Sequence, residues 1–441
     1  MVRAIPAAIV LALVVACGSE PQTPQVAAGC ESFAPYQGYA GTTVSIMSPI
    51  RDVEGDNLVR AWERFSSCTG ITISYEGTDT FEVELPKMVR AGTPPDLALL
   101  PQPGLIRQLA DDKALRPVSP AAREHAEKWW TPDWLRYATV DGTLYAVPFD
   151  ANVKSLVWYS PTMFRDKGYS VPRTWQEMLE LSQQIAADGV KPWCAGIGSG
   201  VATGWPATDW LEDVLLRTVG HDVYDAWVEH RIPFDDPRVL AALDRVDEVL
   251  RNPTYVNGGY GGVKSISTVA WTEGGLPILE GKCAMHRQAS FYSNQWPANA
   301  TIGPDGDIYA FYLPTISDQA SEDVAGKPVL GAGTFVGAFA DRPEVNAVAA
   351  YLATPEFANE HARRGQAISA NKGLDPKSLP QPVARMAAEL LAEPDVVFRF
   401  DGSDLMPAEV GSGTFWQGMT KWINGRSSAD VLADIEKSWP S

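Results

Sequence analysis

The sequence has few metal ligands, little positive charge and no catalytic signature of the common hydrolases. Its five histidines are scattered and its cysteines form no CxxC pair, so neither a metal site nor a cofactor is expected. It contains no G-x-S-x-G and no HExxH pattern. Lys and Arg number 36 against 54 Asp and Glu, and this net charge of −18 argues against nucleic acid or an anionic membrane surface as a partner.

The one pronounced apolar run lies at the start of the chain and is too short to span a bilayer, which takes about 20 apolar residues. Arg3 precedes the run, and Ala16 places a small residue before Cys17, as in an export signal. The segment resembles a bacterial lipobox, although Val14 stands where leucine is commoner. We therefore expect a signal peptide over 1–16, lipidation of Cys17, and a Pro-rich tether over 17–40. The alternative is an ordinary secretory signal in which Cys17 is incidental.

Four cysteines remain after Cys17, and an even number in an exported chain predicts disulfides. Three pairings are open. We favour Cys30–Cys68 and Cys194–Cys283, because each would join segments expected to share a lobe. The alternative is that these cysteines are buried and unpaired.

Alternating strand and helix patterns predict an α/β fold with mixed, mostly parallel sheets flanked by helices. A mature chain of about 425 residues exceeds the size at which one hydrophobic core stops growing, so two lobes are expected. Strand-like segments at 144–149, 153–159 and 329–339 are interpreted as crossings between them. We predict an N-terminal lobe from 41–150 and 333–378, and a C-terminal lobe from 151–332 and 379–441.

From about residue 42 onward, several segments resemble extracellular solute-binding proteins of carbohydrate ABC importers. The branch is family 1, related to maltose-binding proteins and to α-glucoside binders. The order and spacing of the segments carry the resemblance, which rests on 84–104, 145–150, 155–160, 172–175, 204–213 and 401–407. It implies a two-lobed periplasmic-binding-protein-like fold of type II, in which the lobes close on a ligand and a membrane permease accepts the closed form. Gly333 lies at the expected recrossing, where Gly333-Thr334-Phe335 departs from the family's Gly-Gly-x pattern.

Sugar binding requires hydrogen-bond acceptors for hydroxyl groups and flat apolar surfaces for ring faces. The 15 tryptophans, and the rule that ligands sit beyond the carboxyl ends of strands, select the candidates. The expected ligand-binding residues are Asp79, Glu82, Gln102, Asp150, Trp205, Asp209, Arg287, Gln288, Gly333, Asp401, Asp404 and Trp416.

Each candidate also has a structural interpretation. Asp79 and Asp209 suit helix N-caps, and Asp401 and Asp404 suit Asx turns. The remaining alternatives are a solvated helix face for Glu82, a turn for Gln102, the hinge for Asp150, the core for Trp205 and Trp416, and an ion pair for Arg287.

The function expected from these observations is a monomeric, lipid-anchored binder on the outer face of the membrane. It would deliver a sugar, an oligosaccharide or α-glucoside, to an ABC permease. One alternative is a surface enzyme of glycoside hydrolase type, with Glu212-Asp213 or Asp401 and Asp404 as its carboxylate pair. Another is a binder of peptides or polyamines, which the acidic charge fits but the tryptophan-rich motifs fit less well.

Overall fold

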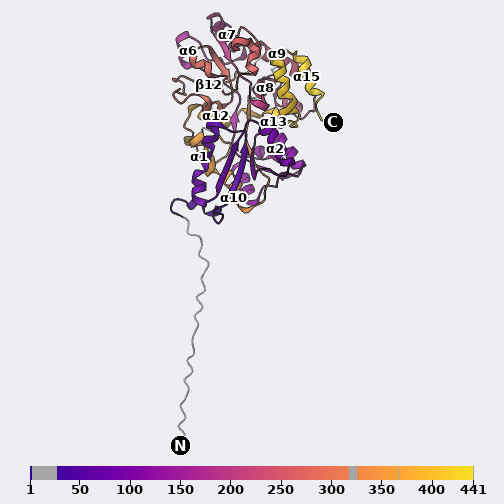
Figure 1. Cartoon of the computed structure of the whole chain (residues 1–441). Coiled ribbons are helices and arrows are strands. Elements are labelled where there is room, and N and C mark those ends of the chain that lie inside the picture. Colours follow the sequence, from indigo (N-terminus) through magenta and orange to yellow (C-terminus); the bar gives the residue numbers. More distant parts are fainter. Residues whose placement is uncertain (2–26, 317–323, 325, 366, 441) are drawn as a thin grey trace.

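The computed structural model describes residues 1, 27–316, 324, 326–365 and 367–440 (Figure 1). The expected signal peptide after Met1, the lipidation site Cys17 and the tether up to residue 26 lie outside the described residues. Within the described part of the chain, no helix is both long and apolar enough to cross a membrane. Figure 1 shows the two lobes stacked, with α10 near one end and α7 near the other.

The N-terminal lobe is built on a five-stranded sheet in the order β2-β1-β3-β14-β6. β1 pairs in parallel with β2 and β3, whereas β14 pairs antiparallel with β3 and β6. Leu58, Trp62 and Phe65 form one buried face of α1, which ends at Gly70 with a left-handed φ of 73°. The strands and main helices are β1 (Thr43–Ser48), β2 (Thr72–Gly77), β3 (Leu97–Leu100), β6 (Ala146–Pro148), β14 (Phe335–Ala338), α1 (Asp52–Thr69), α2 (Phe81–Arg90), α3 (Pro103–Asp111), α4 (Pro120–Trp129), α5 (Pro132–Arg136), α10 (Pro343–Leu352) and α11 (Pro355–Gly365).

The C-terminal lobe has a second five-stranded sheet in the order β10-β9-β11-β8-β12. β9 pairs in parallel with β10 and β11, and β8 pairs antiparallel with β11 and β12. Both sheets are therefore mixed. The elements are β8 (Leu156–Tyr159), β9 (Lys191–Cys194), β10 (Val256–Asn257), β11 (Cys283–Arg287), β12 (Tyr309–Tyr312), α6 (Pro161–Lys167), α7 (Trp175–Ala187), α8 (Trp205–Val228), α9 (Pro237–Leu250), α13 (Gly402–Leu405), α14 (Trp416–Ile423) and α15 (Ser428–Glu436).

A three-stranded sheet in the order β15-β13-β7 joins the lobes. β7 (Asn152–Val153) follows β6 of the first sheet and precedes β8 of the second, and β13 (Lys327–Ala332) precedes β14. The expected crossings at 153–159 and 329–339 are therefore each divided between two sheets. The third strand, β15 (Val396–Phe400), was not anticipated from the sequence. α12 (Pro382–Ala392) precedes it, and β4 (Thr139–Val140) and β5 (Thr143–Leu144) form a separate hairpin.

The expected tether was placed too far along the chain. Residues Glu31–Tyr36 form a 3-10 helix, and Phe33 and Tyr36 are buried against Phe65 and Tyr351. Two aromatic side chains in this segment suffice to draw it into the core. The folded part of the chain thus begins before residue 41, while the exact lobe boundaries stay predictions.

Both favoured disulfide pairings are confirmed. Cys30–Cys68 joins the 3-10 helix to α1, and Cys194–Cys283 joins β9 to β11, with 5.5 Å between the Cα atoms in each pair. Each bridge links elements of one lobe, so neither restrains the lobes relative to each other.

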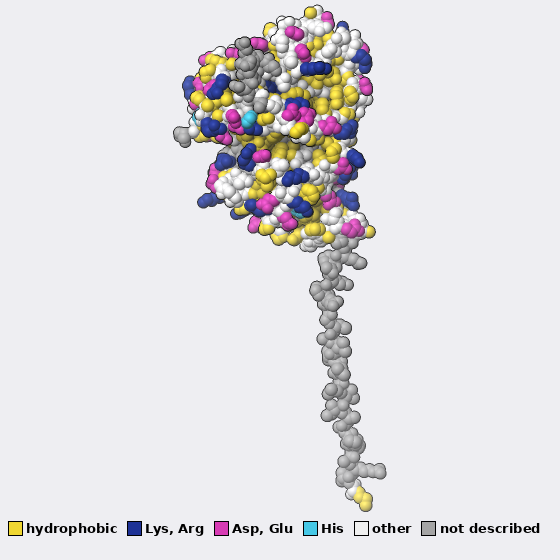
Figure 2. Space-filling view, turned by 180° about the vertical axis from the view of Figure 1, so that it is seen from behind, with side chains coloured by type: hydrophobic (Ala, Val, Ile, Leu, Met, Phe, Trp, Pro, Cys, Tyr) yellow, Lys and Arg dark blue, Asp and Glu magenta, His cyan; other side chains and the backbone are white. Residues whose placement is uncertain are grey.

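Acidic side chains outnumber basic ones in this protein, but the two kinds are intermixed on the surface. Figure 2 shows Lys and Arg interspersed with Asp and Glu over the face opposite to that of Figure 1, with a waist between the lobes. This face therefore offers no continuous field of one sign.

Candidate functional site

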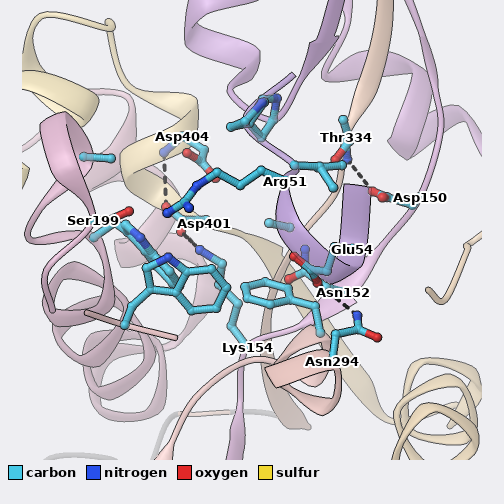
Figure 3. A pocket seen from close by; sticks show the side chains of 18 of the residues that line it. Arg51, Glu54, Asp150, Asn152, Lys154, Ser199, Asn294, Thr334, Asp401 and Asp404 are labelled. Carbon is cyan, nitrogen blue, oxygen red and sulfur yellow. Dashed lines mark hydrogen bonds and ion pairs between the residues drawn. The ribbon is translucent and has the colours of Figure 1, made fainter. Parts of the chain in front are cut away.

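A cavity of about 240 Å³ lies between the lobes, beside the sheet that joins them. The N-terminal lobe reaches it with the segments that follow β1, β2 and β3, so the carboxyl ends of three parallel strands converge there. The C-terminal lobe contributes the start of α8, the 3-10 helix Ser290–Gln295, and α13. Figure 3 shows side chains from both lobes pointing into this space.

An aromatic surface forms the C-terminal wall of the cavity. Trp205 lies edge-on to Trp271 with 5.4 Å between ring centroids, and Phe291 lies 6.1 Å from Trp205 and 5.6 Å from Trp271. All three rings line the cavity and are half-buried. Gly204 precedes Trp205 with a φ of 118°, and a Cβ there would collide with the carbonyl of Trp416. Glycine at this position therefore lets α8 start close enough to α14 to present Trp205.

Lys154 is the buried cation of the site, at the hinge end of the C-terminal wall. Its Nζ donates to Asp209 Oδ1 at 2.9 Å and to Asp401 Oδ2, and it lies 5.2 Å from the Trp205 ring centroid. Burial alone would lower the pKa of Lys154, but Asp209 and Asp401 raise it well above its usual range. Burial disfavours ionisation of Asp401 as well, yet Lys154 holds the pKa of this carboxyl well below its ordinary value. The pair is therefore ionised.

A second layer of charges positions this wall from behind. Arg287 pairs with Asp213 at 2.9 Å and approaches Asp209 at 3.5 Å, with all three side chains buried. Glu212 accepts hydrogen bonds from the backbone N–H groups of Gly402 and Ser403 at 2.7 and 3.1 Å. Because these amides open the single turn of α13, Glu212 holds in place the segment that carries Asp401 and Asp404.

The N-terminal wall carries carboxyls held by neutral donors. Glu54, in the first turn of α1, accepts a hydrogen bond of 3.0 Å from Asn294 of the other lobe. Asp150 accepts one of 2.8 Å from the backbone N–H of Thr334, which links two crossings of the hinge (Figure 3). Burial raises the pKa of Glu54 to about 7 and that of Asp150 to about 6. Both groups therefore titrate close to neutral pH.

Deeper in the cavity, both lobes contribute carboxyl or amide groups. Gln102 donates to Glu82 at 3.3 Å, while the Gln102 Oε1 atom is buried without a partner among the described residues. Burial raises the pKa of Glu82, and raises that of Asp404 well above its ordinary value, with Asp401 as a further cause. This part of the cavity therefore offers carboxyl and amide groups, which can bind the hydroxyl groups of a ligand.

Eight of the twelve expected ligand-binding residues line the cavity: Asp79, Glu82, Gln102, Asp150, Trp205, Asp401, Asp404 and Trp416. Several of these residues also have the structural role that the sequence allowed. Asp401 caps α13 by accepting from the Asp404 amide at 3.1 Å, Asp150 bonds the hinge backbone, and Trp416 is only 3% exposed.

The other four lie behind the lining. Asp209 forms an ion pair with Lys154, and Arg287 forms one with Asp213. Gln288 accepts a hydrogen bond of 2.8 Å from the backbone N–H of Ala289. Gly333 packs so closely on the Asp150 carbonyl and the Trp134 ring that no side chain fits there. A rule based on strand ends selects the right segments, but it does not tell which residue of a segment faces the cavity.

Sequence reasoning missed Lys154, Glu54, Asn294, Trp271 and Phe291. One signal was available, because Lys154 is a lone cation within the apolar run of a predicted crossing and next to Asp150. The others stand in segments without periodicity, and only the lobe arrangement brings them to the cavity. Among the described residues, no group of three His, Cys, Asp or Glu is arranged to hold a metal ion.

Comparison with known proteins shows one family. The chain matches the model of the bacterial extracellular solute-binding proteins over residues 52–358. It is 39% identical over 422 residues to the alpha-glucosides-binding periplasmic protein AglE of Rhizobium meliloti (strain 1021), covering 94% of this chain and 90% of that protein. It is 41% identical over 398 residues to the osmoprotective compounds-binding protein GgtB of Synechocystis sp., covering 90% and 92%.

Solved structures share the fold at lower identity. The bacterial solute receptor AcbH superposes with a TM-score of 0.76 at 19% identity, covering 91% of this chain and 97% of its own. A chitin oligosaccharide binding protein gives a TM-score of 0.75 at 20% identity, covering 91% and 98%. The two-lobed α/β fold is thus shown.

Proposed function

The chain belongs to the bacterial extracellular solute-binding protein family, and we propose that it captures a small sugar in the cavity between its lobes and hands it to an ABC importer. The observation that carries this proposal is the aromatic wall of Trp205, Trp271 and Phe291, opposite a wall of carboxyl and amide acceptors. Support also comes from two relatives named for α-glucosides and for osmoprotective compounds. We favour an α-glucoside or a polyol glycoside.

The two walls match the two kinds of surface on a sugar. The C–H face of a pyranose ring would lie on the indole rings, since flat apolar surfaces stack favourably. Its hydroxyls would donate to Glu82, Asp404 and the unpaired Gln102 Oε1. Carboxyl groups with a raised pKa can accept a hydrogen bond and, when protonated, donate one, which suits hydroxyl groups that do both.

Binding would favour closure of the lobes because the ligand contacts both walls only in the closed form. The hinge that permits this motion is the β15-β13-β7 sheet, whose strands continue into both lobes. A permease that accepts the closed form would thereby receive loaded protein. Lipidation at Cys17, a monomeric state and a place on the outer face of the membrane complete the proposal.

An enzymatic role on carbohydrate is less well supported. Glu212 and Asp213, one of the expected carboxylate pairs, are fully buried and do not line the cavity. Asp401, of the other pair, is bound to Lys154, and glycoside hydrolysis requires a carboxylic acid and a carboxylate free to act on the substrate. The relatives described above are named as binding proteins.

A thermal-unfolding screen of the purified protein with mono-, di- and trisaccharides tests the function. A ligand at about 100 times its Kd adds about 2.7 kcal/mol of apparent stability, a clear rise in Tm. Chromatography of the same mixtures should recover the sugar intact. A rise in Tm with peptides or polyamines alone would overturn the proposal, and sugar breakdown would replace it with an enzyme.

A further inference from the structure

The charges that line the cavity are strongly unbalanced. Two cationic side chains, Arg51 and Lys154, stand among seven carboxyls. The carboxyls are Asp52, Glu54, Asp79, Glu82, Asp150, Asp401 and Asp404. A ligand entering this space therefore meets carboxyl groups from both lobes and few cationic side chains.

Both cations are already committed to carboxylates of the protein. Lys154 lines the cavity, is 5% exposed and is bound by Asp209 and Asp401. Arg51 points into the cavity in Figure 3, and its guanidinium pairs with Asp52 at 2.8 Å. An anionic ligand would therefore share either cation with a carboxylate of the protein.

The acceptors, in contrast, are open. The Asp404 carboxyl lines the cavity and accepts no hydrogen bond from any residue that the structure describes. Glu82 lines the same cavity from the other lobe. Gln102, which is 5% exposed, holds its Oε1 without a partner among the described residues. A donor bound there would find acceptors from both lobes, whereas an anion would meet carboxyl groups and no unpaired cation.

We propose that the cavity selects its ligand by charge, admitting neutral and amine-bearing sugars and rejecting sugars that carry a carboxylate or a phosphate. This inference rests on the proposed function and narrows it. The selecting groups are Glu82 and Asp404, which line the cavity from different lobes, with Gln102 as a neutral acceptor beside Glu82.

Two matched series of probes test the proposal by calorimetry and by the fluorescence of the lining tryptophans. One comprises trehalose, 6-amino-6-deoxytrehalose, trehalose 6-phosphate and the neutral 6-O-acetyl ester, which separates bulk from charge. The other comprises methyl α-glucoside, its 6-amino analogue and methyl α-glucuronide. We expect each anionic member to bind at least about 100-fold more weakly than its neutral parent, and each amine to bind at least as tightly as the parent.

Variants of single residues test whether the discrimination against anionic sugars arises in the cavity. Asp404→Asn should weaken the discrimination against the anionic members by about tenfold or more, because the amide cannot ionise beside an anionic ligand whereas the carboxyl can. Glu124→Gln removes one exposed charge remote from the cavity and should leave the discrimination unchanged. Arg51→Met tests the competing role of this residue as an anchor for anions.

The outcomes separate the inference from the proposed function. Anionic members that bind as tightly as their parents, with affinity lost in Arg51→Met, overturn the charge inference and leave sugar binding intact. Amino sugars that bind while every neutral sugar fails overturn the inference that the cavity admits neutral sugars, and leave the capture of a sugar standing. A panel in which no member binds overturns both.

Discussion

The two walls of the cavity differ in how their charges are held. On the C-terminal wall, Lys154 and Asp401 form an ion pair, and Arg287 and Asp213 form another directly behind it. On the N-terminal wall, Glu54 and Asp150 each accept a hydrogen bond from a neutral donor instead. A carboxyl paired with a buried cation stays ionised, whereas one that is buried with only neutral donors has its pKa raised.

The walls also differ in apolar surface. Every tryptophan and phenylalanine in the lining comes from the C-terminal lobe. That wall therefore provides the aromatic surface and the ion-paired charges, and the N-terminal wall provides carboxyls held by neutral donors.

The largest expected effect is on the ion pairs of the C-terminal wall. Replacing Lys154 with Met leaves Asp209 and Asp401 buried without their cation, which should lower the free energy of unfolding by about 3–5 kcal/mol. Urea unfolding measures this loss. Lys282→Met, which removes an exposed cation, should leave the stability essentially unchanged. A loss below about 1 kcal/mol for Lys154→Met would contradict the difference drawn between the walls.

A smaller effect is expected from titration on the N-terminal wall. Burial raises the pKa of Glu54 from an ordinary value of 4.5 to about 7, with Asp150 and Asp52 as further causes. Because the folded state holds this proton more tightly than the unfolded state, the associated stability is complete below pH 4.5 and lost as pH rises through 7. The loss should amount to about 3 kcal/mol.

Unfolding of wild type and Glu54→Gln at pH 5 and pH 8 measures this effect. The glutamine keeps an acceptor for Asn294 but does not titrate, so the variant should lose less stability over the interval. The slope that remains belongs in part to Asp150, whose pKa burial raises to about 6. Glu63→Gln, an exposed position on the same helix, should reproduce the wild-type slope. An identical slope in Glu54→Gln would show that Glu54 is ionised in the folded protein.

The smallest effect concerns the apolar platform. Trp205→Ala should weaken binding of the sugar identified by thermal screening about tenfold, or about 1.4 kcal/mol, while changing stability little because the ring is half-buried. Isothermal titration measures the affinity. Trp129→Ala removes a partly exposed tryptophan outside the cavity and should leave the affinity unchanged. Equal affinity in Trp205→Ala would remove the ring from the site.

Much of the fold was predictable because its signals are local. The alternation of strands and helices was expected from the residue pattern, and the disulfide pairing followed from segments that share a lobe. The strand β15 was missed because it pairs with β13 at the hinge, far away in sequence. Phe33 and Tyr36 were assigned to the tether because the segment is Pro-rich, but both side chains are buried.

The site was predictable by segment and not by residue. Asp79, Glu82 and Gln102 follow strands whose carboxyl ends meet at one edge of a sheet, so their segments could be found from the chain alone. Whether Asp209 faces the ligand or an ion pair depends on Lys154 and Arg287, which lie 55 and 78 positions away.

The sequence by itself determined the α/β alternation, the two cystine bridges and the supply of acidic and indole side chains, because periodicity, cysteine parity and composition are properties of the chain. Tertiary structure alone decided that Glu54 meets Asn294, that Lys154 neutralises Asp401, and that Glu82 and Asp404 line one cavity. Glu54 and Asn294 come from different lobes, whereas Lys154 and Asp401 come from distant segments of the C-terminal lobe. The strength of each interaction also depends on burial, and a residue becomes buried only when the chain folds.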